Sequence, residues 1–319
     1  MKRSASRNAG RAARAVDVRV PASTANLGAG FDCFGLALGL YLHVRARAVA
    51  GQEESFRMTY SGEGSDSLPP SAGNLIYRAA QRLAEREGFH LPPLDLEVKN
   101  HIPFGRGLGS SAAAIVAGIL VAASFSRRRV PAESLLSCAT EIEGHPDNVA
   151  AALYGGWVIL AETPNEVVVV RRPWPRSVRA VIVSPEARID TRESRRLLPA
   201  EIRREDAVFN LQRVALFGAA IEAGRTDLLS EAMRDRLHQP QRGLLVPGLA
   251  EALELREQPG LVGIALSGSG PSVLALATGH FREIGHAITD IFAQHSFKST
   301  IRVLAAGVSG ASVAGRRVV

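Results

Sequence analysis

The sequence predicts a two-lobed α+β fold, in which a β-rich first lobe is followed by a second lobe of mixed strands and helices. Near the start of the chain, apolar and charged residues alternate as they do in strands. A glycine-rich loop then runs into a long apolar, alanine-rich segment at residues 103–125, which predicts a buried helix. Residues 171–176 contain two prolines and interrupt the pattern before strand and helix signals resume. With 319 residues, 46% of them apolar, the chain can bury the core of two lobes.

The first lobe is expected to span residues 16–172 and to begin with strands. Residues 16–21 and 41–49 alternate apolar and charged side chains, as half-buried strands do. Residues 74–87 carry apolar side chains at helical spacing, which predicts a helix. Residues 94–100 return to the alternation of a strand, so the glycine-rich loop connects a strand to the central helix.

The central helix is expected to lie in the core of the protein. Its apolar segment, residues 112–125, is short for a bilayer, so a buried helix is the better interpretation than a membrane span. Residues 132–143 predict a second helix, which Gly144 ends. Further strands of this lobe are predicted at residues 155–161 and 167–170.

The second lobe is expected to span residues 173–319, because the proline-containing segment before it is the best candidate for a domain boundary. Strand and helix patterns mix along this half, which is typical of an α+β arrangement. Its predicted strands lie at residues 178–184, 262–266 and 273–277, and its predicted helices lie at residues 206–223 and 228–237.

Positive charge is concentrated at the N-terminus of the chain. The net charge is +7, and five basic residues precede the first acid, Asp17, so the remainder is close to balanced. Residues 1–15 contain no apolar run, which excludes a secretory signal and predicts a disordered basic tail, with a transit peptide as an alternative. Only 5% of the residues are aromatic, so we expect no nucleic-acid partner. Cys33 and Cys138 are too few for a disulfide framework, and we expect a cytoplasmic protein without a membrane partner.

The glycine-rich loop at residues 103–112 reads Pro-Phe-Gly-Arg-Gly-Leu-Gly-Ser-Ser-Ala and has the composition of an anion pocket. Gly105, Gly107 and Gly109 permit backbone conformations in which successive amide groups face one ligand. The helix that follows begins with unpaired N–H donors and a partial positive charge. A phosphate group is therefore the expected guest, and the alternative is a glycine-rich turn before a core helix.

The loop differs from three well-known glycine motifs. A Walker A loop requires a lysine, and no lysine occurs between Lys2 and Lys99 or between Lys99 and Lys298. The dinucleotide fingerprint requires a third glycine where Ser110 stands. The nucleophile elbow of hydrolases requires a glycine where Ala113 stands. The sequence therefore predicts a phosphate loop without a lysine.

Three other polar stretches are candidates for the same site. Residues 21–32 place Asn26 and Asp32 on a glycine-containing loop after a strand, where a structural turn is the alternative. Residues 143–148 gather acid, amide and imidazole groups at the end of a helix. Residues 267–272 form a glycine-serine loop between two apolar strands, where a simple hairpin turn is the alternative.

His145 and Asp147 also raise the possibility of an iron centre with two histidines and one carboxylate. Such a centre needs a second histidine, and the nearest later one is His238. We therefore expect these side chains to contact a substrate or magnesium.

In this order, the four stretches resemble the GHMP small-molecule kinases, and the resemblance covers the chain from about residue 16 onward. Residues 103–112 match the Pro-x-x-x-Gly-Leu-Gly-Ser-Ser-Ala loop of that family at every fixed position. The resemblance implies the GHMP kinase fold, with the glycine-loop helix in the N-terminal lobe and an α/β sandwich-like C-terminal lobe. The branch of the family that acts on homoserine is similar at residues 21–28, 30–32, 143–150 and 237–242.

The resemblance further implies a reaction and its partners. The expected reaction is transfer of the γ-phosphoryl group of ATP to the side-chain hydroxyl of L-homoserine, with Mg²⁺ as cofactor, in a homodimer. Catalytic roles are implied for Ser111, Glu143, Asp147 and Asn148, and Mg²⁺ is implied at Ser111 and Glu143, with Glu141 as an alternative ligand. Substrate contacts are implied for Asn26, Asp32, His145, Asn148, Arg195 and Arg242. ATP contacts are implied for Asn74, Pro103, Gly105, Arg106, Gly107, Leu108, Gly109, Ser110, Ser111, Ala112, Gly268, Ser269 and Gly270.

Chemistry suits several of these roles. The Asp32 carboxylate fits an ammonium group, and the planar guanidinium groups of Arg195 and Arg242 fit a carboxylate, although surface arginines are common in this chain. Asn74 is equally placed to cap a helix. Ala29 stands where the family commonly has proline, which makes that loop less rigid. The alternatives are a GHMP kinase with another small hydroxy compound as acceptor and a ligand sensor without catalysis.

Overall fold

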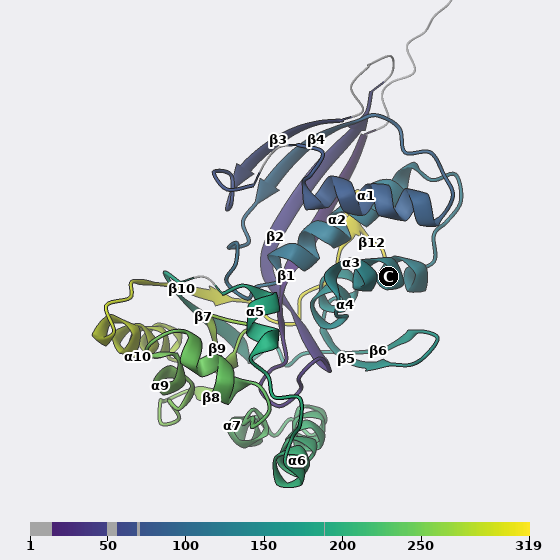
Figure 1. The fold of residues 1–319 in the computed structure, drawn as a ribbon. Coiled ribbons are helices and arrows are strands. Elements are labelled where there is room, and N and C mark those ends of the chain that lie inside the picture. Colours follow the sequence, from purple (N-terminus) through teal and green to yellow (C-terminus); the bar gives the residue numbers. More distant parts are fainter. Residues whose placement is uncertain (1–14, 50–55, 69–70, 188) are drawn as a thin grey trace, which may run out of the picture.

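The computed structural model describes residues 15–49, 56–68, 71–187 and 189–319, and within them two β-sheets organise the chain (Figure 1). The larger sheet has eight strands among the described residues, and its main path runs β12-β11-β1-β2-β4-β3. Strand β5 pairs with β2 and β6 pairs with β5, while β3 and β4 form the parallel pair of this sheet. The strands are β1 (Ala15–Ala25), β2 (Phe34–Ala48), β3 (Phe56–Gly62), β4 (Leu94–Asn100), β5 (Trp157–Glu162), β6 (Val167–Arg172), β11 (Ser312–Val313) and β12 (Arg316–Arg317).

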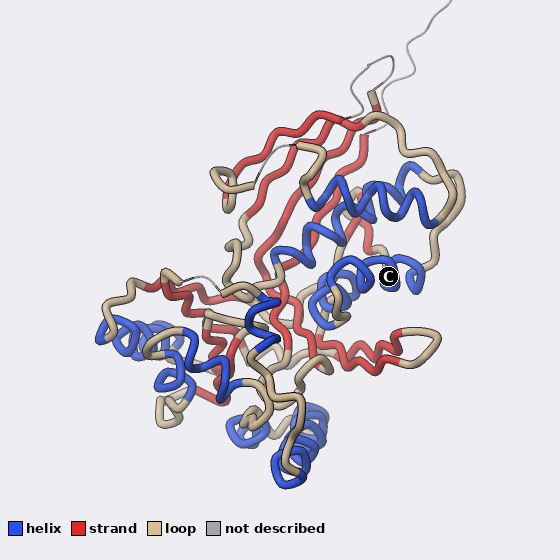
Figure 2. Tube along the Cα trace, viewed as in Figure 1, coloured by secondary structure: helices blue, strands red, loops and turns tan. Residues whose placement is uncertain are grey.

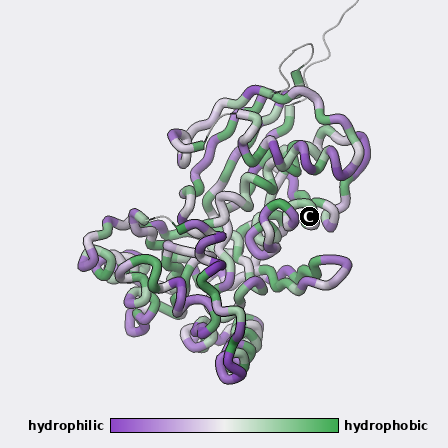
Figure 3. Tube along the Cα trace, in the orientation of Figure 1, coloured by the Kyte–Doolittle hydropathy of each residue, from purple (hydrophilic) through white to green (hydrophobic). Residues whose placement is uncertain are grey.

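Helices α1 (Leu75–Arg86), α2 (Ser110–Phe125), α3 (Ala132–Glu143) and α4 (Asp147–Tyr154) pack beside the larger sheet (Figures 1 and 2). Helix α2 is apolar on all sides, which is why it lies in the core between the sheet and its neighbouring helices. A side chain at Gly118 would come within 2.1 Å of the Ile76 carbonyl oxygen, so glycine lets α1 and α2 approach closely. Hydropathy follows this arrangement, with hydrophilic residues along the outer turns (Figure 3).

The smaller sheet is antiparallel, in the order β10-β7-β9-β8. Successive side chains along its strands point to opposite faces of the sheet, and both faces are buried. Val181, Val273 and Ile264 pack toward α9 and α10, whereas Ala180 and Leu274 belong to the core of the larger sheet. The strands are β7 (Arg179–Pro185), β8 (Leu261–Leu266), β9 (Val273–Ala277) and β10 (Ser299–Leu304). The helices of this half are α5 (Thr191–Arg196), α6 (Arg204–Glu222), η1 (Thr226–Leu228), α7 (Leu229–Ala232), α8 (Gln239–Arg242), η2 (Gly243–Leu245), α9 (Leu249–Leu253) and α10 (Phe281–Gln294).

The α+β class with a β-rich first half is confirmed, and several element boundaries differ from the predictions. The predicted strand at residues 16–21 continues to Ala25, so residues 22–25 belong to β1 and not to the loop, and a register shift between Pro21 and Ala22 accommodates the proline. The predicted helix at 228–237 ends at Ala232, because the Asp235 carboxylate binds the backbone N–H groups of residues 237–239 and starts α8 instead.

The ends of the chain bear on the predicted division into domains. Of the predicted disordered tail, residues 1–14 lie outside the described residues, and Ala15 begins β1. The chain passes from β6 to β7 between Arg172 and Arg179, and it later returns to the larger sheet through β11 and β12. Strand β11 therefore pairs with β1 of the first half, and β12 pairs with β11.

Candidate active site

The glycine-rich loop connects β4 to α2 in the predicted manner. Gly105, Gly107 and Gly109 all have positive φ angles, of 67°, 71° and 66°. Gly109 precedes the first helical residue, Ser110, and no side chain of the described residues caps this helix end. The first turn of α2 therefore begins with backbone donors that the helix itself does not use.

The second glycine loop packs directly against the first. A side chain at Gly107 would lie 2.1 Å from the Ser267 carbonyl oxygen and 2.9 Å from the Gly270 carbonyl oxygen. The Ser267 hydroxyl donates to the Gly107 carbonyl at 2.7 Å and lies 2.9 Å from Thr24 Oγ1, whose hydroxyl can donate to it. Residues 267–270 thus buttress the glycine-rich loop, and the two loops lie together although the chain separates them widely.

Ser111 and Glu143 meet at the start of α2. The Ser111 hydroxyl donates to Glu143 Oε2 at 2.6 Å, which joins the first turn of α2 to the last residue of α3. Burial raises the pKa of Glu143, although the Ser111 hydrogen bond and the nearby His145 partly offset it, while Asp147 adds to it. The carboxylate therefore lies where positive charge would stabilise it. Glu141, by contrast, is exposed and pairs with Arg82 and Arg86.

His145, Asp147 and Asn148 form a compact network at the start of α4. Asp147 Oδ1 lies 2.6 Å from His145 Nδ1 and accepts from the Asn148 backbone N–H at 2.6 Å. The Asn148 side-chain amide donates to the same oxygen at 3.3 Å, and Asn148 Oδ1 accepts from the buried Ser23 hydroxyl at 2.9 Å. Asp147 is only 2% exposed, so its carboxylate mainly orients its two neighbours.

The carboxylates around His145 favour the protonated form of its ring. Burial lowers the pKa of His145, but the hydrogen bond and charge of Asp147, together with Glu143, outweigh burial and raise it. When it is protonated, His145 is a donor and a positive charge between two carboxylates.

Asp32 and Arg195, which were predicted to bind opposite ends of a substrate, bind each other. Arg195 Nη1 donates to Asp32 Oδ2 at 2.9 Å and Nη2 donates to Oδ1 at 2.6 Å, which is a bidentate pair. Both side chains are about one-third exposed, at 34% for Arg195 and 30% for Asp32. The pair therefore remains open to a ligand from solution.

Asn26 shapes the loop that carries Asp32. Its side-chain oxygen accepts from the Asp32 backbone N–H at 3.1 Å, and its amide donates to the Gly268 carbonyl at 3.1 Å. Asn26, Leu27 and Asp32 all adopt positive φ angles, of 72°, 48° and 55°, which are uncommon for residues other than glycine. Strained backbone of this kind persists where surrounding contacts enforce it, and it is frequent at functional sites.

Arg242 is a buried cation without a carboxylate partner among the described residues. Its side chain is 2% exposed, and Nη1 donates to the Gly268 carbonyl at 3.3 Å and faces His238 Nδ1 at 3.2 Å. Burial, together with the charge of Arg195, lowers the pKa of Arg242 to about 10 against the opposing effect of Asp32 and other acids. The Phe31 ring lies 5.2 Å from the Arg242 guanidinium carbon and 5.4 Å from that of Arg195. An anion between these two arginines would relieve their repulsion.

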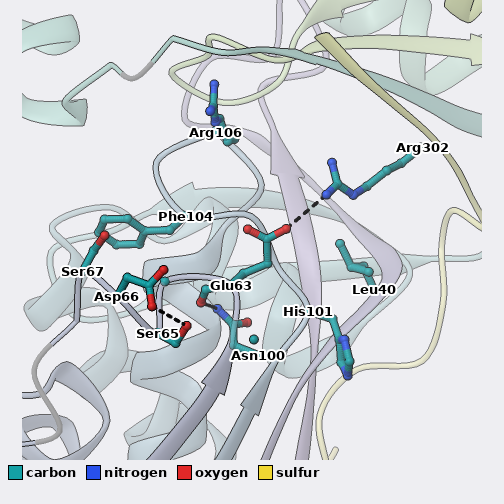
Figure 4. A pocket seen from close by; sticks show the side chains of 12 residues that line it. Leu40, Glu63, Ser65, Asp66, Ser67, Asn100, His101, Phe104, Arg106 and Arg302 are labelled. Carbon is teal, nitrogen blue, oxygen red and sulfur yellow. Dashed lines mark hydrogen bonds and ion pairs between the residues drawn. The ribbon is translucent and has the colours of Figure 1, made fainter. Parts of the chain in front are cut away.

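A pocket of about 680 Å³ opens beside the glycine-rich loop (Figure 4). Phe104 and Arg106 of that loop line it, together with Asn100 and a turn that carries Glu63. Arg302 of β10 closes one side and donates to Glu63 at 3.1 Å. Arg106 also binds the carbonyl oxygens of Pro185 and Ala187, so it bridges the two halves of the chain.

The structure thus groups the predicted residues around two neighbouring centres. Ser111 and Glu143 meet at the start of α2. Asn148 of the Asp147 network binds Ser23, which lies in β1 shortly before the loop of Asn26 and Asp32. Asn74 caps α1, with its side chain accepting from the Ile76 N–H at 3.0 Å, and it does not line the pocket of Figure 4. Ser23, Thr24 and Phe31 were not predicted as site residues, although all three lie within the polar stretch at residues 21–32.

Comparison with known proteins identifies the relatives of this chain. The family model of the GHMP kinases N terminal domain matches residues 74–156, and that of the GHMP kinases C terminal matches residues 218–294. A homoserine kinase from Desulfitobacterium hafniense is 42% identical over 300 residues, which cover 93% of this chain and 99% of the relative. A homoserine kinase from Aquifex aeolicus is 37% identical over 93% of this chain and 99% of its own length.

Solved structures agree with these relatives. The crystal structure of homoserine kinase from Cytophaga hutchinsonii superimposes with a TM-score of 0.83 at 30% identity and covers 94% of this chain and 97% of that one. A galactokinase from Lactococcus lactis has a TM-score of 0.70 at 16% identity, so it shares the fold alone. In the parts of the chain that the structure describes, no helix is both long and apolar enough to cross a membrane.

Proposed function

The chain belongs to the GHMP kinase family, and we propose that it transfers the γ-phosphoryl group of ATP to the side-chain hydroxyl of L-homoserine. The products are ADP and O-phospho-L-homoserine, a precursor in threonine biosynthesis. Relatives named homoserine kinase are 37–43% identical over most of the chain, which supports this acceptor. The paired Asp32 carboxylate and Arg195 guanidinium, with the unpaired Arg242 beside them, are the observation that carries the choice of an amino acid.

The phosphates of ATP are proposed to bind at the glycine-rich loop. Three glycines with positive φ and the uncapped start of α2 offer backbone donors to an anion. The pocket lined by Phe104 and Arg106 adjoins this loop and has room for the nucleoside. Backbone groups of the loop, rather than a lysine, therefore supply the phosphate contacts.

Ser111 and Glu143 are proposed to hold Mg²⁺. A hydroxyl and a carboxylate are the hard oxygen ligands that this cation prefers, and they converge within 2.6 Å of each other. Burial disfavours the Glu143 charge, which a cation would restore. When bound, Mg²⁺ neutralises charge that develops on the transferred phosphoryl group. Glu141 is an unsuitable ligand because Arg82 and Arg86 already hold it.

The amino-acid part of homoserine is proposed to enter between Asp32 and the two arginines. Its ammonium group replaces one Arg195 hydrogen bond at Asp32, and its carboxylate binds Arg242 together with the released face of Arg195. The ion pair between Asp32 and Arg195 is thereby replaced in part by an interaction of Asp32 with the ammonium group and an interaction of the arginines with the carboxylate. A mevalonate-like hydroxy acid has a carboxylate but no ammonium group, so it would leave Asp32 without a partner other than Arg195.

Positioning and charge neutralisation are proposed to carry the chemical step. The homoserine hydroxyl oxygen forms a bond to the γ-phosphorus, the bond to the bridging oxygen of ADP breaks, and the hydroxyl proton leaves to solvent. Asp147 accepts three hydrogen bonds at one oxygen, so its proposed part is to orient Asn148 and His145. Asn148, joined to Ser23, then faces the acceptor hydroxyl.

An ADP-release assay tests the proposed reaction across homoserine, serine, threonine and mevalonate with Mg²⁺-ATP. We expect turnover to be fastest with homoserine and to require a divalent cation. Turnover with mevalonate but not homoserine would assign the chain to another acceptor, and tight homoserine binding without ADP release would favour the sensor function.

The proposal includes a homodimer that works in the cytoplasm. One face of α6 is apolar and exposed, with Leu211 68% and Val208 45% exposed. Across a two-fold axis at the middle of α6, Leu211 would meet the partner's Ala215, so two copies would cover this apolar face. Light scattering is expected to give a dimer for the native chain and a monomer for Leu211→Arg, and a native monomer would remove this part of the proposal.

A further inference from the structure

His238 contacts three residues around the proposed homoserine site, which are Phe31, Gly28 and Arg242. Its ring is fully buried, at 0% exposure, and lies 5.2 Å from the Phe31 ring between centroids. Nε2 is 2.9 Å from the Gly28 carbonyl oxygen, and Nδ1 is 3.2 Å from Arg242 Nη1. One ring therefore connects the loop of Asp32 to the buried arginine.

These two contacts determine the tautomer of His238. A carbonyl oxygen can only accept, so Nε2 carries the proton toward Gly28, and a guanidinium can only donate, so Nδ1 must be the acceptor. Both contacts are satisfied by the neutral Nε2–H ring and by no other protonation state. Burial, which lowers the pKa of His238, agrees with the neutral ring.

The contact with His238 leaves one edge of Arg242 for a ligand. Nη1 faces His238 and Gly268, whereas the buried Nε has no hydrogen-bond partner within the described ranges. The edge formed by Nε and Nη2 is the one that can bind both oxygens of a carboxylate in parallel. The orientation of Arg242 thus decides whether that edge faces the site.

The backbone around His238 is itself fixed. Asp235, whose side chain is fully buried, accepts from the N–H groups of Leu237, His238 and Gln239 at 3.1, 2.9 and 2.7 Å. Asn210 of α6 donates to the same carboxylate at 2.6 Å and to the Ala29 carbonyl at 3.3 Å. The imidazole therefore has little freedom to move relative to the loop that it contacts.

We propose that neutral His238 is the positioning residue for Arg242, which it orients so that the Nε–Nη2 edge binds the carboxylate of the amino-acid substrate. This inference rests on the proposed function for the identity of the substrate. In this proposal His238 touches neither the substrate nor the reacting atoms, and it orients the arginine through the acceptor Nδ1.

Two substitutions separate the two ring nitrogens. In His238→Gln, the side-chain amide can reach the Gly28 carbonyl but leaves no acceptor at the position of Nδ1. In His238→Asn, the shorter side chain keeps an acceptor near Nδ1 and loses the contact with Gly28. We expect His238→Gln to raise the KM for homoserine about tenfold or more, because a hydrogen bond to a charged group is lost. We expect His238→Asn to stay close to the native KM, and the KM for ATP to be unchanged in both.

A carboxylate-free analogue distinguishes positioning from general damage to the fold. Calorimetry compares homoserine with the amino diol in which its carboxylate is reduced to an alcohol. We expect His238→Gln to weaken homoserine binding and to leave diol binding unchanged. Equal weakening of both ligands, an unchanged homoserine affinity, or a larger effect in His238→Asn than in His238→Gln would overturn the inference.

The native protein provides a second measurement if His238→Gln does not fold. Nitrogen-15 NMR is expected to detect the Nε2–H tautomer and a shift of the Nδ1 resonance when homoserine, but not the diol, is added. An imidazolium ring or the Nδ1–H tautomer at neutral pH would refute the assignment. If the native enzyme releases no ADP in response to homoserine, the proposed function fails. If the native enzyme turns over homoserine and His238→Gln has the native KM for homoserine, only the positioning role is contradicted.

Discussion

Replacing Gly107 by alanine would test whether the contact between the two glycine loops maintains the phosphate site. An alanine Cβ would lie 2.1 Å from the Ser267 carbonyl oxygen and 2.9 Å from that of Gly270. Both obstacles are backbone atoms, so no side-chain rotation can make room. The loops must therefore separate, and the 2.7 Å hydrogen bond from Ser267 to the Gly107 carbonyl would be broken.

The expected loss of stability has two parts. A non-glycine residue in the left-handed conformation costs about 1–2 kcal/mol, and Gly107 has a φ of 71°. Overpacking a closed site costs about 1–3 kcal/mol more. Gly88 provides the matched control, since its φ of 66° is similar but a Cβ there would meet no atom of the described residues within 4 Å. Gly88→Ala is therefore expected to lose only about 1–2 kcal/mol.

Urea unfolding of both variants measures the difference, and initial-rate kinetics show where it acts. We expect Gly107→Ala to be the less stable variant and to raise the KM for ATP about tenfold or more, because displaced loop amides no longer converge on the phosphates. Gly88→Ala should keep the native KM. Equal stability of the two variants, or a native KM for ATP in Gly107→Ala, would refute the steric reasoning.

The remaining predictions concern three charged residues. Glu143→Gln should lower kcat about 100-fold or more, whereas Glu141→Gln should not, and the reverse order in the ADP assay would move the metal ligand to Glu141. Burial raises the pKa of Glu143 in the folded protein. The stability of the native protein should therefore fall as the pH rises from the pKa of Glu143 in the unfolded state through its pKa in the folded state. Without Mg²⁺ and ATP, Glu143→Gln should thus be the more stable protein at pH 7, and equal melting temperatures there would contradict this. Arg242→Lys should mainly raise the KM for homoserine, since the bidentate edge is lost, and an unchanged KM would exclude Arg242 from the site. The raised pKa of His145 gives stability that is present below about pH 6.5 and is lost as pH rises through the folded pKa, so His145→Gln should flatten the stability profile measured by calorimetry.

The sequence predicted best the features that depend on interactions between residues close together in the chain. The order of strand, glycine-rich loop and buried helix around residues 94–125 was predicted because glycine spacing and apolar periodicity act within a few residues. Pairing of distant groups was harder to predict. Asp32 and Arg195 were each expected to bind substrate, but their direct ion pair depends on how α5 approaches the first lobe.

Some missed elements did carry a signal. Helix α10 was not predicted, although Ile284, Ile288 and Phe292 recur at helical spacing and are buried. Strand β3 is harder, because it is a parallel edge strand whose side chains are partly exposed along its length. The Asp235 carboxylate that ends the predicted helix at 228–237 shows how one buried acceptor can override helical propensity over several residues.

The return of β11 and β12 to the larger sheet constrains how the two halves of the molecule can move. The chain crosses between the sheets after β6 and crosses back after β10, so two covalent connections join them. Both connections, together with the 2.7 Å hydrogen bond from the Ser267 hydroxyl to the Gly107 carbonyl, hold the two glycine loops against each other. Separation of the loops would therefore break that hydrogen bond, while each connection would still limit how far the two halves can move apart.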